Sequence, residues 1–318
     1  MKRLLALMFV AAVSLGVAAP DAARKPVVIK PGVTVGGVRV GGLMSEAART
    51  RVEAAFGRPL RLSFRDKQWR ISPRYLGASA TIDDAVADAL RATPYTRVPL
   101  EVAAAQPRIR RYVGRLDRLF SGDAVDTAVV GVANRRPKFT EAQTGLAVER
   151  EAMAQALTRA LQTNERRTAI ELIVTEVQPK VTLANYGPVL IIFRGSNKLA
   201  LFDGPTHVRT FGVATGSSQY PTPLGSYSIA TMQLNPWWIP PPKSDWAKDK
   251  KPVPPGPGNP LGTRWMGLTA PLVGIHGTPD AASIGYSASH GCIRMRVPEA
   301  EALFSQVNVG TPVLIVPT

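Results

Sequence analysis

The chain has 318 residues, of which 45% are hydrophobic, and this length favours two domains with enough apolar material for packed cores. The formal net charge of +16 would suggest nucleic acid in a cytosolic protein, but the amino terminus indicates export, so we expect no nucleic-acid partner. The expected counter-ions are anionic wall polymers, lipid head groups or acidic peptides; the alternative is a basic protein that is simply soluble.

Residues 1–20 have the pattern of a secretory signal peptide. The positive pair Lys2-Arg3 precedes an apolar run over residues 4–17, and small residues at 17–19 offer a cleavage site. An uncleaved membrane anchor is the alternative, although the run is shorter than the roughly 20 residues of a spanning helix. We therefore expect a protein of the cell wall, periplasm or extracellular space.

The segment 32–180 alternates strand and helix patterns. Residues 33–40 alternate as a strand, Ser45 caps a helix that runs to about Phe56, and residues 60–71 form a hairpin that turns at Arg65-Asp66. Helices over 83–90 and 151–157 are each followed by a strand-like run, "VPLEVAA" and "AIELIVTEV", which favours duplicated α+β units over chance similarity.

Arginines cluster around a further helix of this segment, at Arg108, Arg110, Arg111, Arg115 and Arg118. Such a run usually marks a solvated face, and binding of an anionic polymer is the alternative.

The segment 184–318 reads as strand after strand, including a hairpin around residues 195–197, with one clear helix near 298–307. The whole chain is therefore predicted to be α+β, with a β-rich second domain. A proline-rich stretch at 239–260 interrupts this domain and carries Trp246. Because a loop of this length is either functional or disordered, we interpret it as a flap that faces a substrate.

Cys292 is the only cysteine of the chain. Exported cysteines are usually paired, so a single one indicates a reactive thiol or an intermolecular bridge. His290 lies two residues before it and His276 lies on the preceding strand, and either imidazole could take the thiol proton. Gly291 permits a tight turn whose N–H groups could hold an oxyanion, and Arg294 offers a cation for a carboxylate.

Other interpretations remain open from residue types alone. Cys292 could be a small buried hydrophobic residue, and His276 could be a core histidine bonded to a carbonyl. Zinc binding by the thiol and both histidines lacks a fourth ligand and a standard spacing, so no metal is expected. His207 stands alone in a strand pattern and is interpreted as a bystander.

The stretch "HGTPDAASIGYSASHGCIRM" at 276–295 closely resembles the active-site signature of L,D-transpeptidase catalytic domains, in which a histidine precedes an S-H-G-C block. "TPLGSYSI" at 222–229 and "NPLGTRWMGL" at 259–268 are also similar to the family, and the likeness spans 184–318. Residues 32–180 resemble, more weakly, the peptidoglycan-binding modules that often precede such domains. The spacing from His276 to the S-H-G-C block is towards the short end for the family, which leaves the shape of residues 278–288 open.

The resemblance implies that Cys292 attacks the carbonyl of the third residue of a donor tetrapeptide and forms a thioester as D-alanine leaves. The amine of an acceptor stem then resolves the thioester and gives a 3→3 cross-link. His276 would be the general base and acid, and the backbone of His290, Gly291 and Cys292 would hold the oxyanion.

The resemblance also implies supporting roles. Ser289 and His290 would order the loop, Arg294 would face a substrate carboxylate, and Tyr286 with the nearby tryptophans would shape the stem-peptide groove. No cofactor is needed, and acylation by carbapenems is expected. An L,D-carboxypeptidase or an enzyme that attaches proteins to the wall would use the same residues. From another class, a non-catalytic wall-binding protein with a spare thiol is the alternative.

Overall fold

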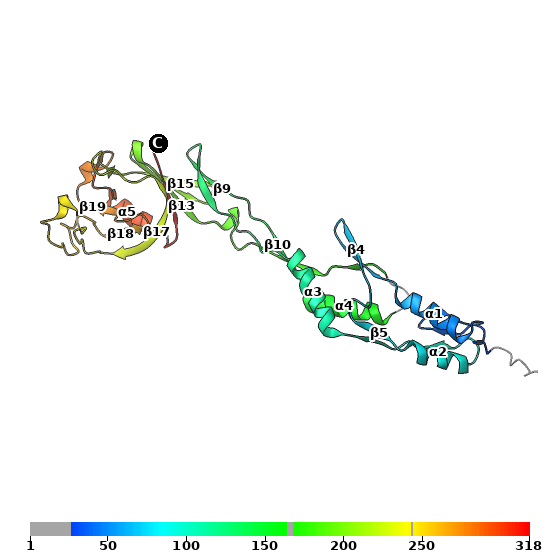
Figure 1. Cartoon of the computed structure of the whole chain (residues 1–318). Helices are drawn as coiled ribbons and strands as arrows, with labels where there is room; N and C mark the ends of the chain where they lie inside the picture. Colours follow the sequence, from blue (N-terminus) through cyan, green and yellow to red (C-terminus); the bar gives the residue numbers. More distant parts are fainter. Residues whose placement is uncertain (1–26, 164–167, 243) are drawn as a thin grey trace, which may run out of the picture. The chain divides into compact units, whose positions relative to one another are not determined.

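The computed structural model describes residues 27–163, 168–242 and 244–318 (Figure 1). The signal peptide predicted at 1–20 lies outside these residues. Within them, no helix has both the length and the apolar character that crossing a membrane requires. The predicted α+β class is confirmed, because the described residues contain five α-helices and a large β-rich carboxy-terminal part.

The chain packs into two compact units that are interleaved in sequence. The first unit comprises the chain up to Arg118 and Glu149–Ile173, and the second comprises Leu119–Val148 and Val174–Thr318. The domain limits predicted from the sequence stay predictions, and the two units are described separately below.

The first unit packs helices against short strands around a core that includes Ile29, Val52 and Val86. Its helices are α1 (Ser45–Phe56), α2 (Ile82–Arg91), α3 (Gln106–Phe120, whose end belongs to the second unit) and α4 (Arg150–Gln162). Its strands are β1 (Thr34–Val35), β2 (Val38–Arg39), β3 (Leu60–Phe64), β4 (Lys67–Ile71), β5 (Ala78–Ala80), β6 (Arg97–Val98), β7 (Val102–Ala104) and β11 (Ile170–Glu171).

Local signals place most of these elements where the sequence predicts them. The helix Ser45–Phe56 is confirmed, although its cap is Met44 and Ser45 is its first residue. The hairpin β3–β4 is also confirmed, and its turn residue Arg65 has a φ of 52°. The single strand predicted over 33–40 is wrong. Gly36 and Gly37 have φ values of 51° and 79°, which reverse the chain and make the hairpin β1–β2.

The strand predicted from "AIELIVTEV" is also divided. Its first part, β11, pairs with β3 in the first unit. Its second part, β12 (Val174–Val177), pairs with β10 (Gly145–Val148) in the second unit. The chain passes from the first unit to the second between Ile173 and Val174, and the continuous apolar pattern of the sequence gives no sign of this boundary.

The second unit is built on a large sheet. Its remaining strands are β8 (Val129–Ala133), β9 (Arg136–Phe139), β13 (Pro188–Phe193), β14 (Lys198–Asp203), β15 (Thr206–Gly212), β16 (Thr215–Gly216), β17 (Gly225–Leu234), β18 (Arg264–Leu268), β19 (Gly274–Thr278), β20 (Ser287–Ser289), β21 (Ile293–Arg296) and β22 (Pro312–Val316). The helix α5 spans Val297–Phe304, and 3-10 helices occur at Leu183–Asn185, Arg194–Ser196, Asp245–Ala247 and Ala281–Ser283.

Eight strands form this sheet in the order β15-β14-β13-β22-β17-β18-β19-β21. Strand β13 is apolar on both sides, as expected for a strand that is covered on both faces. Leu190 and Ile192 point into the core that also holds residues of α5, whereas Val189, Ile191 and Phe193 point into a second cluster against the hairpin β8–β9. The sheet is therefore a rigid platform with two packed layers.

The candidate site lies at one edge of this platform. Strand β21 is the last strand of the sheet and runs parallel to β19, with Ile275 opposite Ile293 and His276 opposite Arg294. Ile275 and Ile293 are fully buried in the core. Because neighbouring side chains alternate along a strand, His276 and Arg294 point to the other face.

Candidate active site

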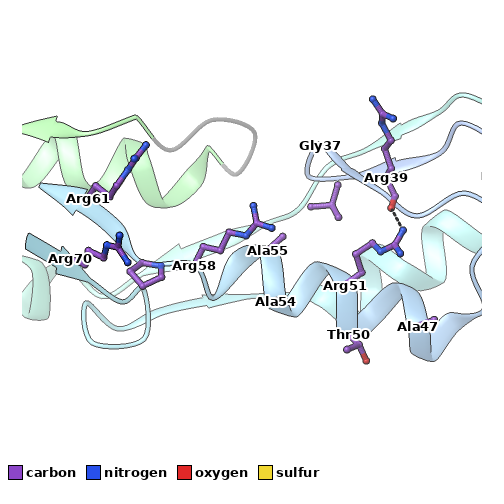
Figure 2. Close-up of a pocket in the computed structure, with 12 residues that line it drawn as sticks. Gly37, Arg39, Ala47, Thr50, Arg51, Ala54, Ala55, Arg58, Arg61 and Arg70 are labelled. Atoms are coloured by element: carbon purple, nitrogen blue, oxygen red, sulfur yellow. Dashed lines mark hydrogen bonds between the residues drawn. The ribbon is translucent and has the colours of Figure 1, made fainter.

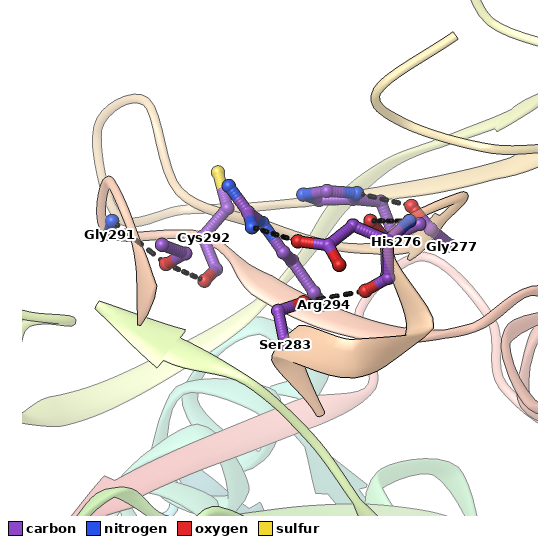
Figure 3. Close-up of polar contacts among 9 residues, drawn as sticks. His276, Gly277, Ser283, Gly291, Cys292 and Arg294 are labelled. Carbon is purple, nitrogen blue, oxygen red and sulfur yellow. Dashed lines mark hydrogen bonds and ion pairs between the residues drawn. The ribbon is translucent and has the colours of Figure 1, made fainter. Parts of the chain in front are cut away.

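The strand register brings the predicted thiol and imidazole to one face of the sheet edge. Cys292 directly precedes β21 and lies two residues from Arg294, so both side chains lie on the face that carries His276. Figure 3 shows the Cys292 sulfur, the Arg294 guanidinium and the His276 ring next to one another. The arrangement follows from the local sequence, because Ile293 holds this segment by its burial in the core.

His276 is held as a neutral base. Its side chain is 4% exposed, and its Nδ1 lies 2.6 Å from the carbonyl oxygen of Gly277. A carbonyl oxygen can only accept, so Nδ1 carries the proton and Nε2 keeps a lone pair on the side of Cys292 (Figure 3). Burial, together with the nearby Arg294 cation, lowers the pKa of His276 to about 4, although the bond to Gly277 opposes the shift. The ring is therefore uncharged at neutral pH.

Cys292 is a free thiol that is partly exposed. Its Sγ donates a long hydrogen bond of 3.6 Å to the carbonyl of Leu272. Burial raises the pKa of the Cys292 thiol, whereas a backbone bond from Gly274 and the charge of Arg294 lower it. These shifts favour the neutral forms of both the thiol and the imidazole.

The turn that carries the thiol is fixed by hydroxyl groups. Ser289 Oγ donates to the Cys292 carbonyl at 2.6 Å and accepts the N–H of Gly291 at 3.1 Å. Gly291 has a φ of 110°, which favours glycine. These contacts support the loop-ordering role expected for Ser289. They also occupy the Gly291 N–H, so an oxyanion role fits only the N–H groups of His290 and Cys292.

Thr222 ties this turn to the body of the unit and was not singled out as a site residue from the sequence. Its side chain is fully buried, donates to the Gly291 carbonyl at 2.9 Å and accepts the N–H of Gly216 at 2.8 Å. The signal that could have found it is the stretch "TPLGSYSI", of which it is the first residue.

The Arg294 guanidinium lies next to Cys292 and His276 (Figure 3). It forms an ion pair of 3.8 Å with Asp280, and its side chain keeps part of its surface accessible. Asp280 was not expected from the sequence, because it belongs to the segment whose shape was open. Tyr286, which was expected to shape the stem-peptide groove, has a side chain that is 67% exposed, and its carbonyl accepts a bond of 3.3 Å from the Thr215 N–H.

His290 lies in an aromatic stack outside the sheet. Its ring is parallel to that of Trp246, with centroids 4.0 Å apart and planes at 16°, and it contacts Tyr220 at 5.0 Å. Trp246 in turn lies 6.3 Å from Trp238. Partial burial and the charge of Arg294 lower the pKa of His290, which favours the neutral ring.

The proline-rich stretch is held in place by one buried amide. Asn259 is fully buried, and its Nδ2 donates to the carbonyl groups of Pro236, Val253 and Pro254 at 2.8, 3.3 and 3.1 Å. Its Oδ1 accepts the N–H of Leu261 at 2.8 Å. The loop therefore has a fixed base, although proline removes the backbone pairing that a strand would offer.

Trp265 lies beside the imidazole on the neighbouring strand. Trp265 pairs with His276 in the register of β18 and β19, and the two rings are 5.9 Å apart at 30°. A Cβ at Gly274 would lie 2.3 Å from the Trp265 ring, so only glycine leaves space for the indole there. The indole thus forms one wall beside the base.

The remaining histidine is apart from this site. His207 lies on the exposed strand β15, where Nε2 is 2.8 Å from Thr210 Oγ1 and the ring touches Phe202. Across the described ranges, no three His, Cys, Asp or Glu side chains are grouped as metal ligands.

Comparison with known proteins gives a consistent result for this unit. The family model described as the L,D-transpeptidase catalytic domain (YkuD) matches residues 188–315. YqjB of Bacillus subtilis, which carries the name of an L,D-transpeptidase, is 37% identical over 134 residues, or 40% of this chain and 70% of YqjB. YkuD of Bacillus licheniformis, named likewise, is 34% identical over 119 residues, or 37% of this chain and 59% of YkuD.

Solved structures resemble the chain more loosely. A mutant L,D-transpeptidase from Enterococcus faecium aligns with 86% of this chain and 99% of its own, at 15% identity and a TM-score of 0.37. An L,D-transpeptidase from Mycobacterium smegmatis aligns with 61% of this chain and 98% of its own, at 16% identity and a TM-score of 0.36.

Proposed function

The chain belongs to the L,D-transpeptidase family, and we propose that this acyltransferase-type enzyme joins peptidoglycan stem peptides by 3→3 cross-links. The observation that carries the proposal is the placement of Cys292 and His276 on one face of the parallel pair β19–β21. The Nδ1–H of His276 is tied to a carbonyl, so the remaining nitrogen is free to accept a proton. A neutral base beside a thiol is one arrangement that supports nucleophilic acyl transfer.

The first half-reaction forms the thioester. Cys292 Sγ attacks the carbonyl carbon of the third stem residue while His276 Nε2 takes the thiol proton. The N–H groups of His290 and Cys292 stabilise the negative oxygen. The C–N bond to the terminal D-alanine then breaks, and His276 returns the proton to the leaving amine.

The second half-reaction transfers the acyl group. The side-chain amine of the acceptor's third residue attacks the thioester carbon, a C–N bond forms and the C–S bond breaks. His276 takes a proton from the attacking amine and returns it to the sulfur, which restores the neutral pair.

The charged and aromatic groups around the thiol suit a peptide substrate. Arg294 would face a stem carboxylate, and its ion pair with Asp280 would orient it in the free enzyme. We assign to Trp246 the role of a flap residue, because its stack on His290 places the proline-rich stretch beside the thiol-bearing turn. Tyr286 is exposed and would contact the substrate from outside the sheet.

This function fits a protein exported to the cell wall. The signal-like residues 1–20 and the net charge of +16 suit an envelope rich in anionic polymers. The first unit would then hold the enzyme at its polymeric substrate.

A single assay tests the chemistry. Purified enzyme and its Cys292→Ala variant are incubated with disaccharide-tetrapeptide, and the products are weighed by mass spectrometry. We expect a cross-linked dimer and released D-alanine with the wild type, and neither with the variant. A trimmed tripeptide without dimer would identify an L,D-carboxypeptidase instead. Unchanged D-alanine release by Cys292→Ala would refute the thioester route.

A further inference from the structure

A groove of about 1060 Å³ in the first unit is lined by arginines from four separate elements. Arg39 comes from β2, Arg51 from α1, Arg61 from β3 and Arg70 from β4, and Arg58 follows α1. Figure 2 shows Arg39 and Arg51 at one end, Arg58 between, and Arg61 and Arg70 at the other end. The cations are thus distributed along the groove.

The local structure forces these side chains outward. In β3, Leu60 and Leu62 are buried, so the alternation of the strand exposes Arg61 between them. In β4, Ile71 is buried and Arg70 is exposed. The register places Arg61 directly opposite Arg70. Two like charges in such a cross-strand pair destabilise the fold, and a bound anionic ligand would reduce the repulsion between them.

The protein supplies little negative charge at this place. Among the residues that the structure describes, no Asp or Glu lines the groove, and no described carboxylate forms an ion pair with Arg39, Arg61 or Arg70. The two glutamates of α1, Glu46 and Glu53, are not among its lining residues, and Glu53 is bonded to Arg49 at 3.1 Å. The helix face towards the groove carries small residues, Ala47, Thr50 and Ala54, which leave the space open.

We propose that this groove binds an extended phosphodiester-linked polyanion of the cell wall. Every basic side chain among its described lining residues is arginine, whose planar guanidinium can hold two oxygens of one phosphate. A row of cations in a concave groove fits a polymer strand better than a single phosphate. A flat membrane surface fits less well, because no aromatic or leucine side chain that could enter a bilayer is among the described lining residues.

This inference takes only the cell-wall location from the proposed function. The arginines of α3 that stand out in the sequence lie outside the groove. The polymer-binding surface is therefore assigned to residues that are scattered in sequence and come together only in the fold.

The test measures binding of a synthetic glycerol phosphate oligomer to the full chain by calorimetry at low and high salt. We expect Arg61→Gln/Arg70→Gln to weaken binding about tenfold or more and to reduce its salt dependence. The matched control is Arg110→Gln/Arg111→Gln, which removes the same charge from exposed positions on α3 and should bind within about twofold of the wild type. Circular dichroism and thermal unfolding check that both variants fold.

Each other result overturns the proposal. Equal losses in both double variants would mean that net charge, and no particular groove, attracts the polymer. Equal binding of poly-glutamate would refute the preference for phosphate, and binding of anionic lipid vesicles without the oligomer would identify a membrane instead. No substrate is turned over in this assay, so its failure is distinct from failure of the thioester chemistry.

Discussion

In the second unit the candidate base His276 is buried and the Cys292 thiol beside it is partly exposed, whereas in the first unit the groove arginines are all exposed to solvent. Burial lowers the pKa of His276 to about 4, and its Nδ1 is bonded to the carbonyl of Gly277. Exposed guanidinium groups keep their charge and act together through a field that salt screens. The candidate site of the second unit should therefore depend on individual contacts, and the arginine groove on the sum of several weak interactions. Single substitutions should have large effects in the site and small effects in the groove.

The largest effect is expected at the base. In His276→Gln, acylation of Cys292 by a carbapenem should slow by about 10²–10⁴-fold, because no group remains to accept the thiol proton. Intact-protein mass spectrometry against time measures the rate. His207→Gln is the matched control, since it removes an exposed imidazole on β15 and should react at the wild-type rate. If His276→Gln were acylated at the wild-type rate, His276 would not be the base, and the buried site would not depend on this imidazole.

A smaller effect is expected when the pH is lowered. The pKa of His276 is about 4 in the folded protein and 6.5 in its ordinary state, so the unfolded chain binds a proton first as the pH falls. Stability from the neutral ring is complete above pH 6.5 and is lost as the pH falls towards 4, by about 3 kcal/mol. Urea unfolding at pH 7 and pH 4 should show this loss in the wild type beyond that of His276→Gln. An equal loss of unfolding free energy in the wild type and in His276→Gln would show that folding does not lower the pKa of His276.

The smallest effect is expected at the edge of the site. Trp246→Ala removes the stack on His290 and should raise the KM for the donor tetrapeptide roughly two- to tenfold, with a smaller change in kcat. Trp237→Ala is the control, because Trp237 is 57% exposed. Steady-state kinetics would sharpen the comparison by showing how far the contact-dependent region extends. If Trp246→Ala and Trp237→Ala had the same KM and kcat, Trp246 would not contribute to substrate binding, and the site would not extend beyond His290.

Much of the candidate site could be predicted because its chemistry is concentrated in one short stretch. Cys292, His290 and Ser289 lie within four consecutive positions, and the alternation of a strand relates Cys292 to Arg294. Local turn signals likewise predicted the hairpin β3–β4 at Arg65-Asp66.

Contacts between distant segments could not be predicted in this way. Thr222 reaches Gly291, and Asn259 gathers the carbonyl groups of Pro236 and Val253, yet a buried threonine or asparagine has no periodic signature. The groove has the same origin, because its arginines belong to separate elements that only the fold of the first unit assembles. The arginines that are close in sequence, around α3, lie outside this groove, and their interpretation as a solvated face stays a prediction.

The interleaving of the two units limits how this enzyme can be dissected or recombined. The chain leaves the first unit after Arg118, returns at Glu149 and leaves again after Ile173. A fragment cut at residue 184 would lack the hairpin β8–β9 and expose Val189, Ile191 and Phe193 on one side of the sheet. Such a fragment would be prone to aggregate. To replace the first unit with that of another protein, residues 119–148 must stay with the second unit, although they lie between two segments of the first. A single crossover cannot achieve this exchange.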